Sequence, residues 1–266
     1  MSSGWHVVKY GGSLGEAALK GFAADVATLA RQGLRLLVVH GGGPEVSRWS
    51  ERLGLEPRWL GGLRVTDAET LALAEMVLAG RVSKALSAAI TAAGVPALGL
   101  SALDAGLIEA VPYPAASGLG CVARPGRVDT ALLEHLADGG WLTVLAPIAA
   151  LGGEHYNVNA DDVAAAVAGA LRADELIMLT DVAGIWESGG GELRFLERAT
   201  ADRLRELLES GEIAGGMRPK VLAALQALSL GAHRARIIDG RTEHALVRAI
   251  DDPHLGTELL GEVAEA

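Results

Sequence analysis

The chain has 266 residues, of which 50% are hydrophobic and 4% aromatic, and its formal net charge is -10. This length suits one large α/β domain or two smaller lobes, and the acidic balance argues against general nucleic-acid binding. A single cysteine, Cys121, excludes a disulfide framework and a cysteine-rich zinc site within one chain. With no apolar stretch long enough to cross a bilayer and no signal-peptide pattern, we expect a cytoplasmic protein.

In the first half of the chain, short apolar runs alternate with amphipathic segments. The pattern predicts strands at 5–8, 34–39, 95–100 and 141–148, and helices at 16–32, from 44, at 66–93 and at 129–138. Thr66-Asp67-Ala68-Glu69 matches a capping box, so the third helix should begin at Thr66, and Gly80 should break or bend it. Prolines and glycines in 107–127 predict short antiparallel strands and turns.

The second half continues the alternation. Helices are predicted at 159–171, 200–210 and 218–230, with strands at 174–180 and 233–238, a short helix after Gly240 and an edge strand at 256–259. The glycines at 189–191 predict a hairpin tip or a flexible loop. Alternating strands and helices of these lengths are typical of an α/β protein with a parallel sheet.

Polar and glycine clusters stand directly after three of the predicted strands. They are Lys9-Tyr10-Gly11-Gly12, His40-Gly41-Gly42-Gly43 and Asp181-Val182-Ala183-Gly184. Ligands of parallel sheets bind beyond the carboxyl ends of the strands, so these clusters should meet at one rim. Glycines permit close backbone approach and lysine adds positive charge, which suits a phosphate-bearing ligand.

The first candidates are the lysine and the glycines at these strand ends. Lys9 either points at a bound phosphoryl group or is a solvated lysine beside a turn. Gly41 to Gly43 precede Pro44, which opens a helix, and so leave free amides at a helix N-terminus. Such amides favour an anion, and a tight turn alone would need only one glycine.

Three further candidates are polar residues next to predicted helices. Arg64 could hold a carboxylate bidentately, or could pair with Asp67 or Glu69 on the following helix. Asn159 could be a helix N-cap with Asp161 in the first turn, which leaves Asn157 unexplained.

Lys220 follows Gly215-Gly216-Met217-Arg218-Pro219 and is the last of these candidates. It either serves an anion-binding loop or is an ordinary lysine in a first helical turn, where the helix dipole disfavours it.

The common nucleotide and hydrolase motifs are absent. The chain has no G-x-x-x-x-G-K-[ST], no H-E-x-x-H and no G-x-S-x-G, and Val46 stands where G-x-G-x-x-G would need its last glycine. His40 and His155 alone lie in polar or glycine-rich loops, and we expect no protein-held metal.

Taken together, six segments resemble the amino acid kinase family, and within it the acetylglutamate kinases. They are Lys9-Tyr10-Gly11-Gly12, His40-Gly41-Gly42-Gly43-Pro44, Gly62-Leu63-Arg64-Val65-Thr66, Tyr156-Asn157-Val158-Asn159-Ala160-Asp161, Thr180-Asp181-Val182-Ala183-Gly184 and Gly216-Met217-Arg218-Pro219-Lys220. Any one segment is weak evidence, but six in this order over about residues 5–260 are specific.

The resemblance implies a three-layer αβα sandwich around a mainly parallel, roughly eight-stranded open sheet. It implies an N-terminal lobe, 1–174, that binds the acyl amino acid and dimerises, and a C-terminal lobe, 175–266, that binds ATP. The implied reaction moves the γ-phosphoryl group of ATP, with Mg²⁺, to the side-chain carboxylate of N-acetyl-L-glutamate, the second step of arginine biosynthesis. We therefore expect a homodimer that binds neither nucleic acid nor membranes.

The resemblance also implies the roles of individual residues. Lys9 and Lys220 would neutralise the transferred phosphoryl group and Asp161 would orient them. Gly12, Gly42, Gly43, Arg64 and Asn157 would contact substrate. The implied nucleotide-binding residues are Gly11, Asp181, Val182, Ala183, Gly184, Ile185, Trp186, Glu212, Ile213 and Ala214.

The chemistry fits these residues, because a glutamyl carboxylate, with a reference pKa of about 4.3, is ionised at neutral pH and needs no general base. The barrier is repulsion between two anions, which paired lysines and amides lower. Two alternatives remain. One is a kinase of carrier-protein-bound α-aminoadipate, and the other is a non-catalytic amino-acid or nucleotide sensor on the same fold.

Overall fold

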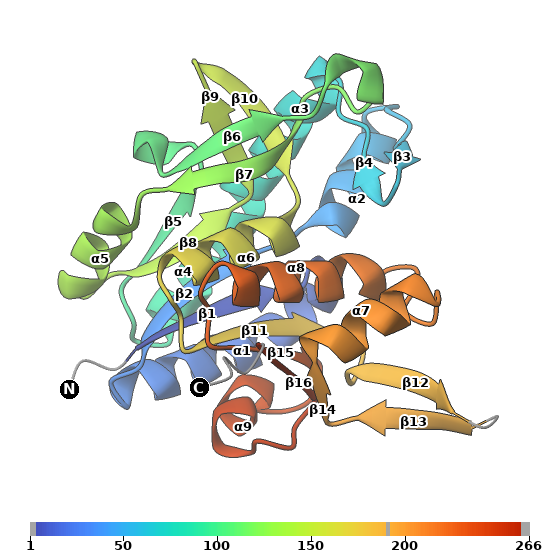
Figure 1. Ribbon diagram of the computed structural model, residues 1–266. Helices are drawn as coiled ribbons and strands as arrows, with labels where there is room; N and C mark the ends of the chain where they lie inside the picture. The colour runs from blue at the N-terminus through green and yellow to red at the C-terminus, as the bar shows by residue number, and fades with distance from the viewer. Residues whose placement is uncertain (1–3, 190–191, 262–266) are drawn as a thin grey trace.

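The computed structural model describes residues 4–189 and 192–261, and an eight-stranded sheet runs through its centre (Figure 1). Across the sheet the strands are β14 (Arg198–Thr200), β16 (Thr257–Leu260), β15 (Arg234–Asp239), β11 (Glu175–Thr180), β1 (Trp5–Tyr10), β2 (Arg35–His40), β8 (Leu142–Ala146) and β5 (Ala97–Ser101). Only the β15–β16 pair is antiparallel. The expected α/β class and strand number are confirmed.

The central strands are apolar on both faces because helices cover both. All residues of β11 are buried, as are four of the six residues of β1 at its carboxyl end. Since β1, β2, β8, β11 and β15 run in one direction, their carboxyl ends meet at one rim. This rim carries the polar and glycine clusters that follow β1, β2 and β11 in the sequence.

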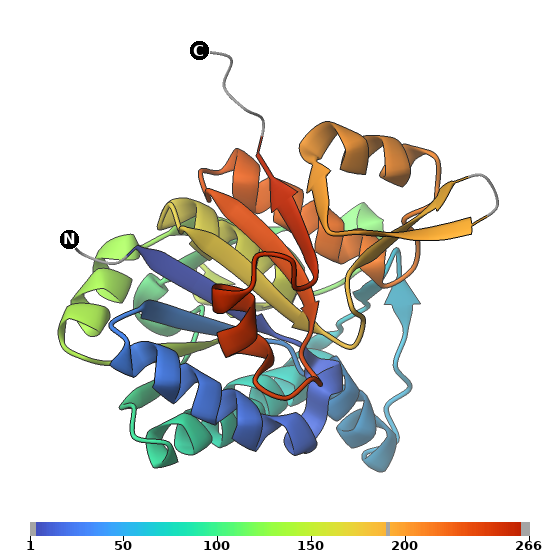
Figure 2. The same cartoon turned by 90° about the horizontal axis from the view of Figure 1, so that it is seen from below.

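Two layers of helices enclose the sheet (Figure 2). One face packs against α5 (Thr130–Asp138), α6 (Ala160–Ala170) and α8 (Met217–Ser229), and the other against α1 (Gly15–Arg31), α4 (Ser83–Ala92) and α9 (Ala245–Asp251). Alanine-rich α6 is almost entirely buried between α8 and the strands. Alanines at these positions let the two helices and the sheet approach closely, which explains a core with few aromatic residues.

The remaining elements stand around the rim. Helices α2 (Gly43–Arg52), α3 (Ala68–Glu75) and α7 (Ala201–Glu209) complete the layers, and β6 (Ile108–Pro112), β7 (Val122–Val128), β9 (Ile148–Leu151) and β10 (Glu154–Val158) pair in a closed circuit. Two hairpins, β3 (Trp59–Leu60) with β4 (Leu63–Arg64) and β12 (Ile185–Gly189) with β13 (Glu192–Leu196), project outward (Figures 1 and 2). The predicted hairpin at 189–191 is confirmed from its strands; Gly190 and Gly191 lie outside the described residues.

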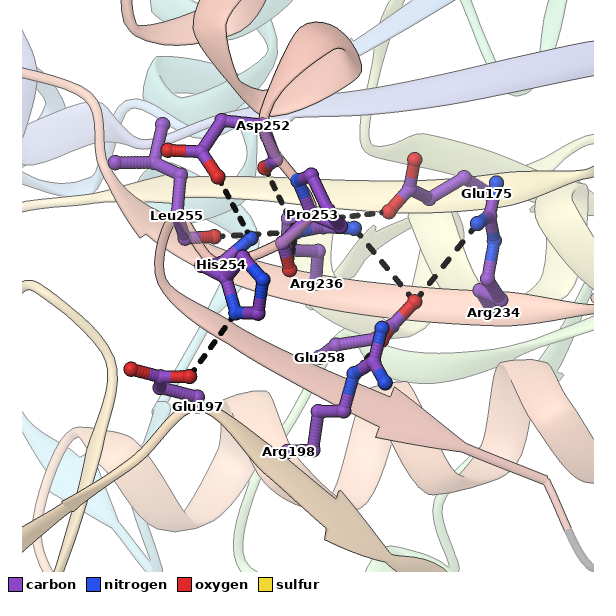
Figure 3. Close-up of polar contacts among 10 residues, drawn as sticks. All are labelled: Glu175, Glu197, Arg198, Arg234, Arg236, Asp252, Pro253, His254, Leu255 and Glu258. Carbon is purple, nitrogen blue, oxygen red and sulfur yellow. Dashed lines mark hydrogen bonds and ion pairs between the residues drawn. The ribbon is translucent and has the colours of Figure 1, made fainter.

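A buried ion cluster fixes the C-terminal strands (Figure 3). The Arg236 guanidinium on β15 lies 2.8 Å from Glu175 on β11 and 3.6 Å from Glu258 on β16. It also donates to the carbonyl oxygen of Pro253 in the loop between α9 and β16. These bonds hold β16 beside β15 in the antiparallel direction.

Three expectations need correction, and one hairpin was not foreseen. The cap of α3 is Asp67, which accepts from the Thr70 amide, so Thr66 is not the N-cap. Gly80 does not break the helix, because Met76–Val82 continues as a π-helix (η2) into α4. The strand at Thr257–Leu260 is internal; the edge is β14, whose three residues are too few for a periodic signal. The β9–β10 hairpin was not predicted, because Gly152 and Gly153 at its turn were not recognised.

Candidate active site

A cavity of about 270 Å³ opens at the carboxyl rim of the sheet, between the strands of the two chain halves. Residues before position 175 and residues after it both contribute to its wall. The lining includes nine of the predicted site residues: Lys9, Gly11, Gly12, Gly42, Gly43, Arg64, Asn157, Asp161 and Lys220. Folding therefore brings together the catalytic and substrate-binding candidates from both halves of the chain.

Two lysines converge on one carboxylate in this cavity. Lys9 Nζ lies 2.8 Å from Asp161 Oδ1, and Lys220 Nζ lies 3.3 Å from Asp161 Oδ2. The Lys9 and Asp161 side chains are 7% and 8% exposed, and that of Lys220 is 20% exposed, so water screens the trio only weakly. The two cations and one anion leave a local charge of +1 inside a chain of net charge -10.

Burial and neighbouring charges shift the pKa values of Asp161 and Lys9. Burial by itself would raise the pKa of Asp161, but Lys9 and Lys220 outweigh burial and hold that pKa below its ordinary value. Burial lowers the pKa of Lys9, while Asp161 opposes this shift. An anionic ligand beside Lys9 would favour its charged form, so binding and charge support one another.

Local structure explains how these three side chains meet. Lys9 stands near the carboxyl end of β1, and Lys220 lies in the first turn of α8. Asp161 is in the first turn of α6, where the Asn159 side chain accepts from its amide and caps the helix. The N-cap expectation for Asn159 is thus confirmed, and it orients the carboxylate that the lysines share.

The glycine turns after β1 and β2 touch each other. A Cβ on Gly12 would lie 2.7 Å from the Gly42 nitrogen, so only glycine permits this approach. The Gly41 amide donates to Tyr10 O, and the Gly42 carbonyl accepts from Val46. Among the hydrogen bonds of the described residues, none uses the amides of Gly42 and Gly43, which leaves two donors at the N-terminus of α2.

Side chains bind the other two carbonyls of the glycine run. His40 is fully buried, and its Nδ1 lies 2.9 Å from Gly41 O, which makes Nδ1 the donor. Burial and the charge of Lys9 lower the pKa of His40 to about 4, so the imidazole is neutral at physiological pH. Arg64 Nη2 donates to Gly43 O at 3.0 Å. With the carbonyls bound inside the protein, the loop offers amides to an anion.

Neighbouring groups hold the Arg64 guanidinium in the wall of the cavity. Its Nη2 also donates to Ser47 Oγ at 2.6 Å, and its guanidinium lies 4.4 Å from the centre of the Trp59 ring. Its Nη1 is buried and has no hydrogen-bond partner within the described part of the chain. Arg64 therefore does not pair with Asp67 or Glu69, the alternative left open by the sequence.

The structure gives a position for Asn157, which helix capping left unexplained. It lies on β10, and its Nδ2 donates to Thr66 Oγ1 at 3.2 Å. The side chain lines the same cavity as the glycine turns. Its amide can therefore contact a ligand held by Arg64.

The predicted nucleotide segments lie outside the lining of this cavity. Asp181–Gly184 form the loop after β11, and Glu212 Oε2 accepts from the Ser188 amide, which joins the second segment to β12. The exposed members are Asp181, Val182, Ala183, Trp186, Glu212 and Ala214. Ile185 and Ile213 are core residues, 1% and 3% exposed, so their side chains face away from solvent.

Several lining residues were not singled out from the sequence. They include Ser13, Trp59, Leu63, Leu78, Val122 and Thr180. Leu63 and Thr180 stand in segments that carry the resemblance, and Trp59 opens an apolar pair before the Gly61-Gly62 turn that leads to Arg64. Leu78 and Val122 belong to ordinary apolar runs, so no local pattern marks them.

Two features of the described residues concern a metal ion and a membrane. Within residues 4–189 and 192–261, no group of three or more histidine, cysteine, aspartate or glutamate side chains is placed to hold a metal ion. No helix in the same ranges has both the length and the hydropathy needed to traverse a bilayer.

The chain is similar in sequence to proteins of one known family. Residues 4–239 match the model of the amino acid kinase family. Acetylglutamate kinase of Arabidopsis thaliana (chloroplastic) is 42% identical over 259 residues, 96% of this chain and 75% of that protein. Acetylglutamate kinase of Symbiobacterium thermophilum is 42% identical over 262 residues, 94% and 89% respectively.

A solved structure agrees in fold over nearly the whole chain. The N-acetylglutamate synthase of Neisseria gonorrhoeae, in complex with coenzyme A and N-acetyl-glutamate, superposes with a TM-score of 0.84 at 28% identity. The match covers 98% of this chain and 60% of the synthase chain.

Proposed function

The chain belongs to the amino acid kinase family, and from that premise we propose that it transfers the γ-phosphoryl group of ATP to the side-chain carboxylate of N-acetyl-L-glutamate. The product is an acyl phosphate, formed in the arginine pathway. The observation that carries the proposal is the meeting of Lys9 and Lys220 on Asp161, in the same cavity as Arg64 and Asn157.

The substrate would lie between the two chain halves. The unpartnered Nη1 of Arg64 would bind the α-carboxylate, and the Asn157 amide would contact the N-acetylamide. Trp59 and Leu63 would form the apolar wall around the acetyl group. The side-chain carboxylate would then point towards the amides of Gly42 and Gly43.

Phosphoryl transfer needs alignment and charge neutralisation, and no proton is moved. A carboxylate oxygen forms a bond to the γ-phosphorus, the bond from that phosphorus to the β,γ-bridging oxygen breaks, and ADP leaves with the electron pair. Lys9 and Lys220 would balance the charge on the transferred group and on ADP, with the glycine amides as further donors. Asp161 holds both ammonium groups at fixed positions before substrate arrives.

Mg²⁺ would enter with the nucleotide. Asp161 is the buried carboxylate of the cavity and is already bound by two lysines, so we propose that the ATP phosphates supply most of the ion's oxygen ligands. When bound, the ion would neutralise phosphate charge.

The nucleotide itself would bind to the second chain half, along Gly11, the loop 181–186 and the segment 212–214. Thr180 supports this placement, because it lines the cavity just before that loop. Ile185 and Ile213 would contribute backbone groups only.

We propose a lobe division at residues 174 and 175, and a homodimer formed through the first lobe. The sheet supports the division, because β1, β2, β8 and β5 come from the first lobe and the other four strands from the second. For the dimer, β5 stands at the outer edge of the sheet in the first lobe, which is where a second copy would pack. Sedimentation at a mass of one chain would contradict the homodimer.

A hydroxamate assay tests the substrate. Hydroxylamine traps acyl phosphates, and we expect MgATP-dependent hydroxamate from N-acetyl-L-glutamate at a rate at least a hundredfold above that from unacetylated glutamate. Carrier-protein-bound α-aminoadipate is the competing substrate. Preference for that substrate would overturn the proposal, and no turnover of either, with nucleotide binding retained, would favour a sensor.

A further inference from the structure

Thr66 lies behind the wall of the candidate active site. It is fully buried and does not line the cavity, whereas Arg64, two residues earlier, and Asn157 on β10 both line it. Its side chain does not cap α3, because Asp67 does so. The hydroxyl of Thr66 instead forms two hydrogen bonds, which lead to the two proposed substrate contacts.

Backbone hydrogen bonds hold Thr66 in place independently of its side chain. Its amide donates to Leu119 O at 2.9 Å, and its carbonyl accepts from the Cys121 amide at 2.7 Å. Cys121 O in turn accepts from the Asn157 amide at 3.0 Å. Helix α3, which begins just after Thr66, lies beside β10 (Figure 1). The main chain therefore keeps Thr66 next to Asn157 even when the hydroxyl is removed.

The hydrogen bonds of the hydroxyl decide which end of the Asn157 carboxamide faces Thr66. Thr66 Oγ1 lies 2.8 Å from Arg64 O, and because a carbonyl oxygen can only accept, the single hydroxyl hydrogen is donated there. Oγ1 can then only accept from Asn157, 3.2 Å away, so the atom that faces it must be the Nδ2 donor. The opposite orientation would place two acceptors against each other beside a buried residue.

This orientation leaves the oxygen of the Asn157 side chain for a ligand. Among the hydrogen bonds of the described residues, none ends on Asn157 Oδ1. A ligand group that binds Oδ1 must be a donor. In N-acetyl-L-glutamate with both carboxylates ionised, the amide N–H is the one donor.

We propose that Thr66 is a positioning residue for substrate recognition, whose hydroxyl fixes the Asn157 carboxamide so that Oδ1 accepts from the amide N–H of the substrate. The same hydroxyl holds Arg64 O, so it joins both substrate contacts in one unit. The proposal rests on the proposed function, because it takes N-acetyl-L-glutamate as the ligand. A threonine that only closed the turn between Arg64 and Asp67 would not affect which ligand group Asn157 binds.

Calorimetry with two ligands tests this orientation without any need for turnover. The ligands are N-acetyl-L-glutamate and its ester analogue (S)-2-acetoxyglutarate, which has nearly the same shape but an ester oxygen in place of the N–H. Thr66→Val keeps the branched shape and removes the hydroxyl, whereas Thr66→Ser keeps the hydroxyl. Thr143→Val changes a buried threonine of β8 that lies outside the cavity lining, and so controls for loss of a buried hydroxyl elsewhere.

We expect the wild type to bind the ester at least tenfold more weakly than N-acetyl-L-glutamate, because the ester oxygen would face Oδ1. Thr66→Val should lower this preference to less than threefold, because the carboxamide can then turn Nδ2 towards the ester oxygen. Thr66→Ser and Thr143→Val should each keep a preference of at least tenfold. Thr66→Ala removes the hydroxyl without adding bulk, and it gives the same measurement if Thr66→Val does not fold.

Equal binding of the two ligands to the wild type would overturn the positioning role, as would an undiminished preference in a folded variant without the hydroxyl. A preference lost equally in Thr66→Ser would also overturn it, because the effect would not follow the hydroxyl. Failure of the wild type to bind N-acetyl-L-glutamate would refute both the proposed substrate and this role. Binding and turnover of N-acetyl-L-glutamate without a preference over the ester would refute the role of Thr66 alone.

Discussion

Asp161 shows how one residue sets the chemistry of the site. A carboxylate that is 8% exposed would be costly without partners, and its two lysines stabilise it while it fixes their positions. The pair of cations exceeds the single anion, so the trio attracts the phosphates that the proposed reaction brings. Arg64 is held in a similar way, since Ser47, Gly43 and Trp59 contact its guanidinium while Nη1 has no hydrogen-bond partner among the described residues, which suits the proposed substrate carboxylate.

Arg64→Lys tests the assignment of the substrate carboxylate. An ammonium group cannot donate to Gly43 O, Ser47 Oγ and a carboxylate in the fork geometry of arginine, so we expect the KM for N-acetyl-L-glutamate to rise at least tenfold. The KM for ATP should stay within twofold. Steady-state kinetics measures both, with Arg58→Lys, 68% exposed, as the control. An unchanged KM for N-acetyl-L-glutamate would remove Arg64 from the substrate site.

At the scale of elements, the ion cluster of Figure 3 explains why the last strand reverses direction. The Arg236 and Glu258 side chains stand opposite each other in the β15–β16 register, and each is 3% exposed. Loss of Arg236 would leave Glu175 and Glu258 buried without their shared partner. A buried charge without a partner costs more than the pair contributes when intact.

Arg236→Met should therefore lower the free energy of unfolding by about 3–5 kcal/mol. Arg198→Met removes a 56% exposed partner of the same Glu258, and we expect a change of only about 0–1 kcal/mol. Chemical denaturation of the two variants measures the difference. Equal losses of unfolding free energy in the two variants would show that the burial of Arg236 does not increase its contribution to stability.

Asp162 gives helix α6 a pH-dependent stability. Burial, together with the charge of Asp161, raises the pKa of Asp162 to about 6, and Arg124 only partly opposes this; Tyr113 faces the same carboxyl. The folded state therefore holds a proton that the unfolded state has already lost. Stability from this group is complete below its unfolded pKa of about 3.8 and falls as pH rises to about 6.

Asp162→Asn should remove that dependence. We expect the variant to be more stable than the wild type by about 1–2 kcal/mol at pH 7.5 and to differ little at pH 4. Unfolding midpoints at the two pH values measure this change. A variant equally stabilised at both would show that Asp162 does not titrate between them.

For the whole molecule, one sheet joins the two halves of the chain along the β1–β11 pair, and the cavity takes residues from both halves. The α/β class, the parallel strands and the meeting of their carboxyl ends followed from the sequence, because apolar runs and glycine clusters are local patterns. The cavity around Lys9, Asp161 and Lys220 followed only from the resemblance, since contacts between distant residues have no local signature. The place of Leu78 in the cavity and the neutral state of His40 depend on packing and could not be inferred.

Hydrogen exchange tests the proposed assignment of N-acetyl-L-glutamate to the first lobe and of ATP to the second. N-acetyl-L-glutamate should slow exchange in the β3–β4 hairpin and at the glycine turns, because it would lie against Arg64 and Gly42. An ATP analogue should slow exchange at 181–186 and 212–214. If each ligand protected the other's segments instead, the proposed lobe assignment would be wrong.

The most direct test of the central claim is the affinity for ADP with aluminium fluoride, which mimics the transferred phosphoryl group, at saturating N-acetyl-L-glutamate. The wild type should bind ADP at least tenfold more tightly with aluminium fluoride than without it. The Lys220→Ala variant should lose this gain in affinity, and its turnover should fall at least tenfold while it remains folded. Lys20→Ala, which changes an exposed lysine on α1, should keep both the gain in affinity and the turnover. An equal gain in affinity for Lys220→Ala and the wild type would contradict the account.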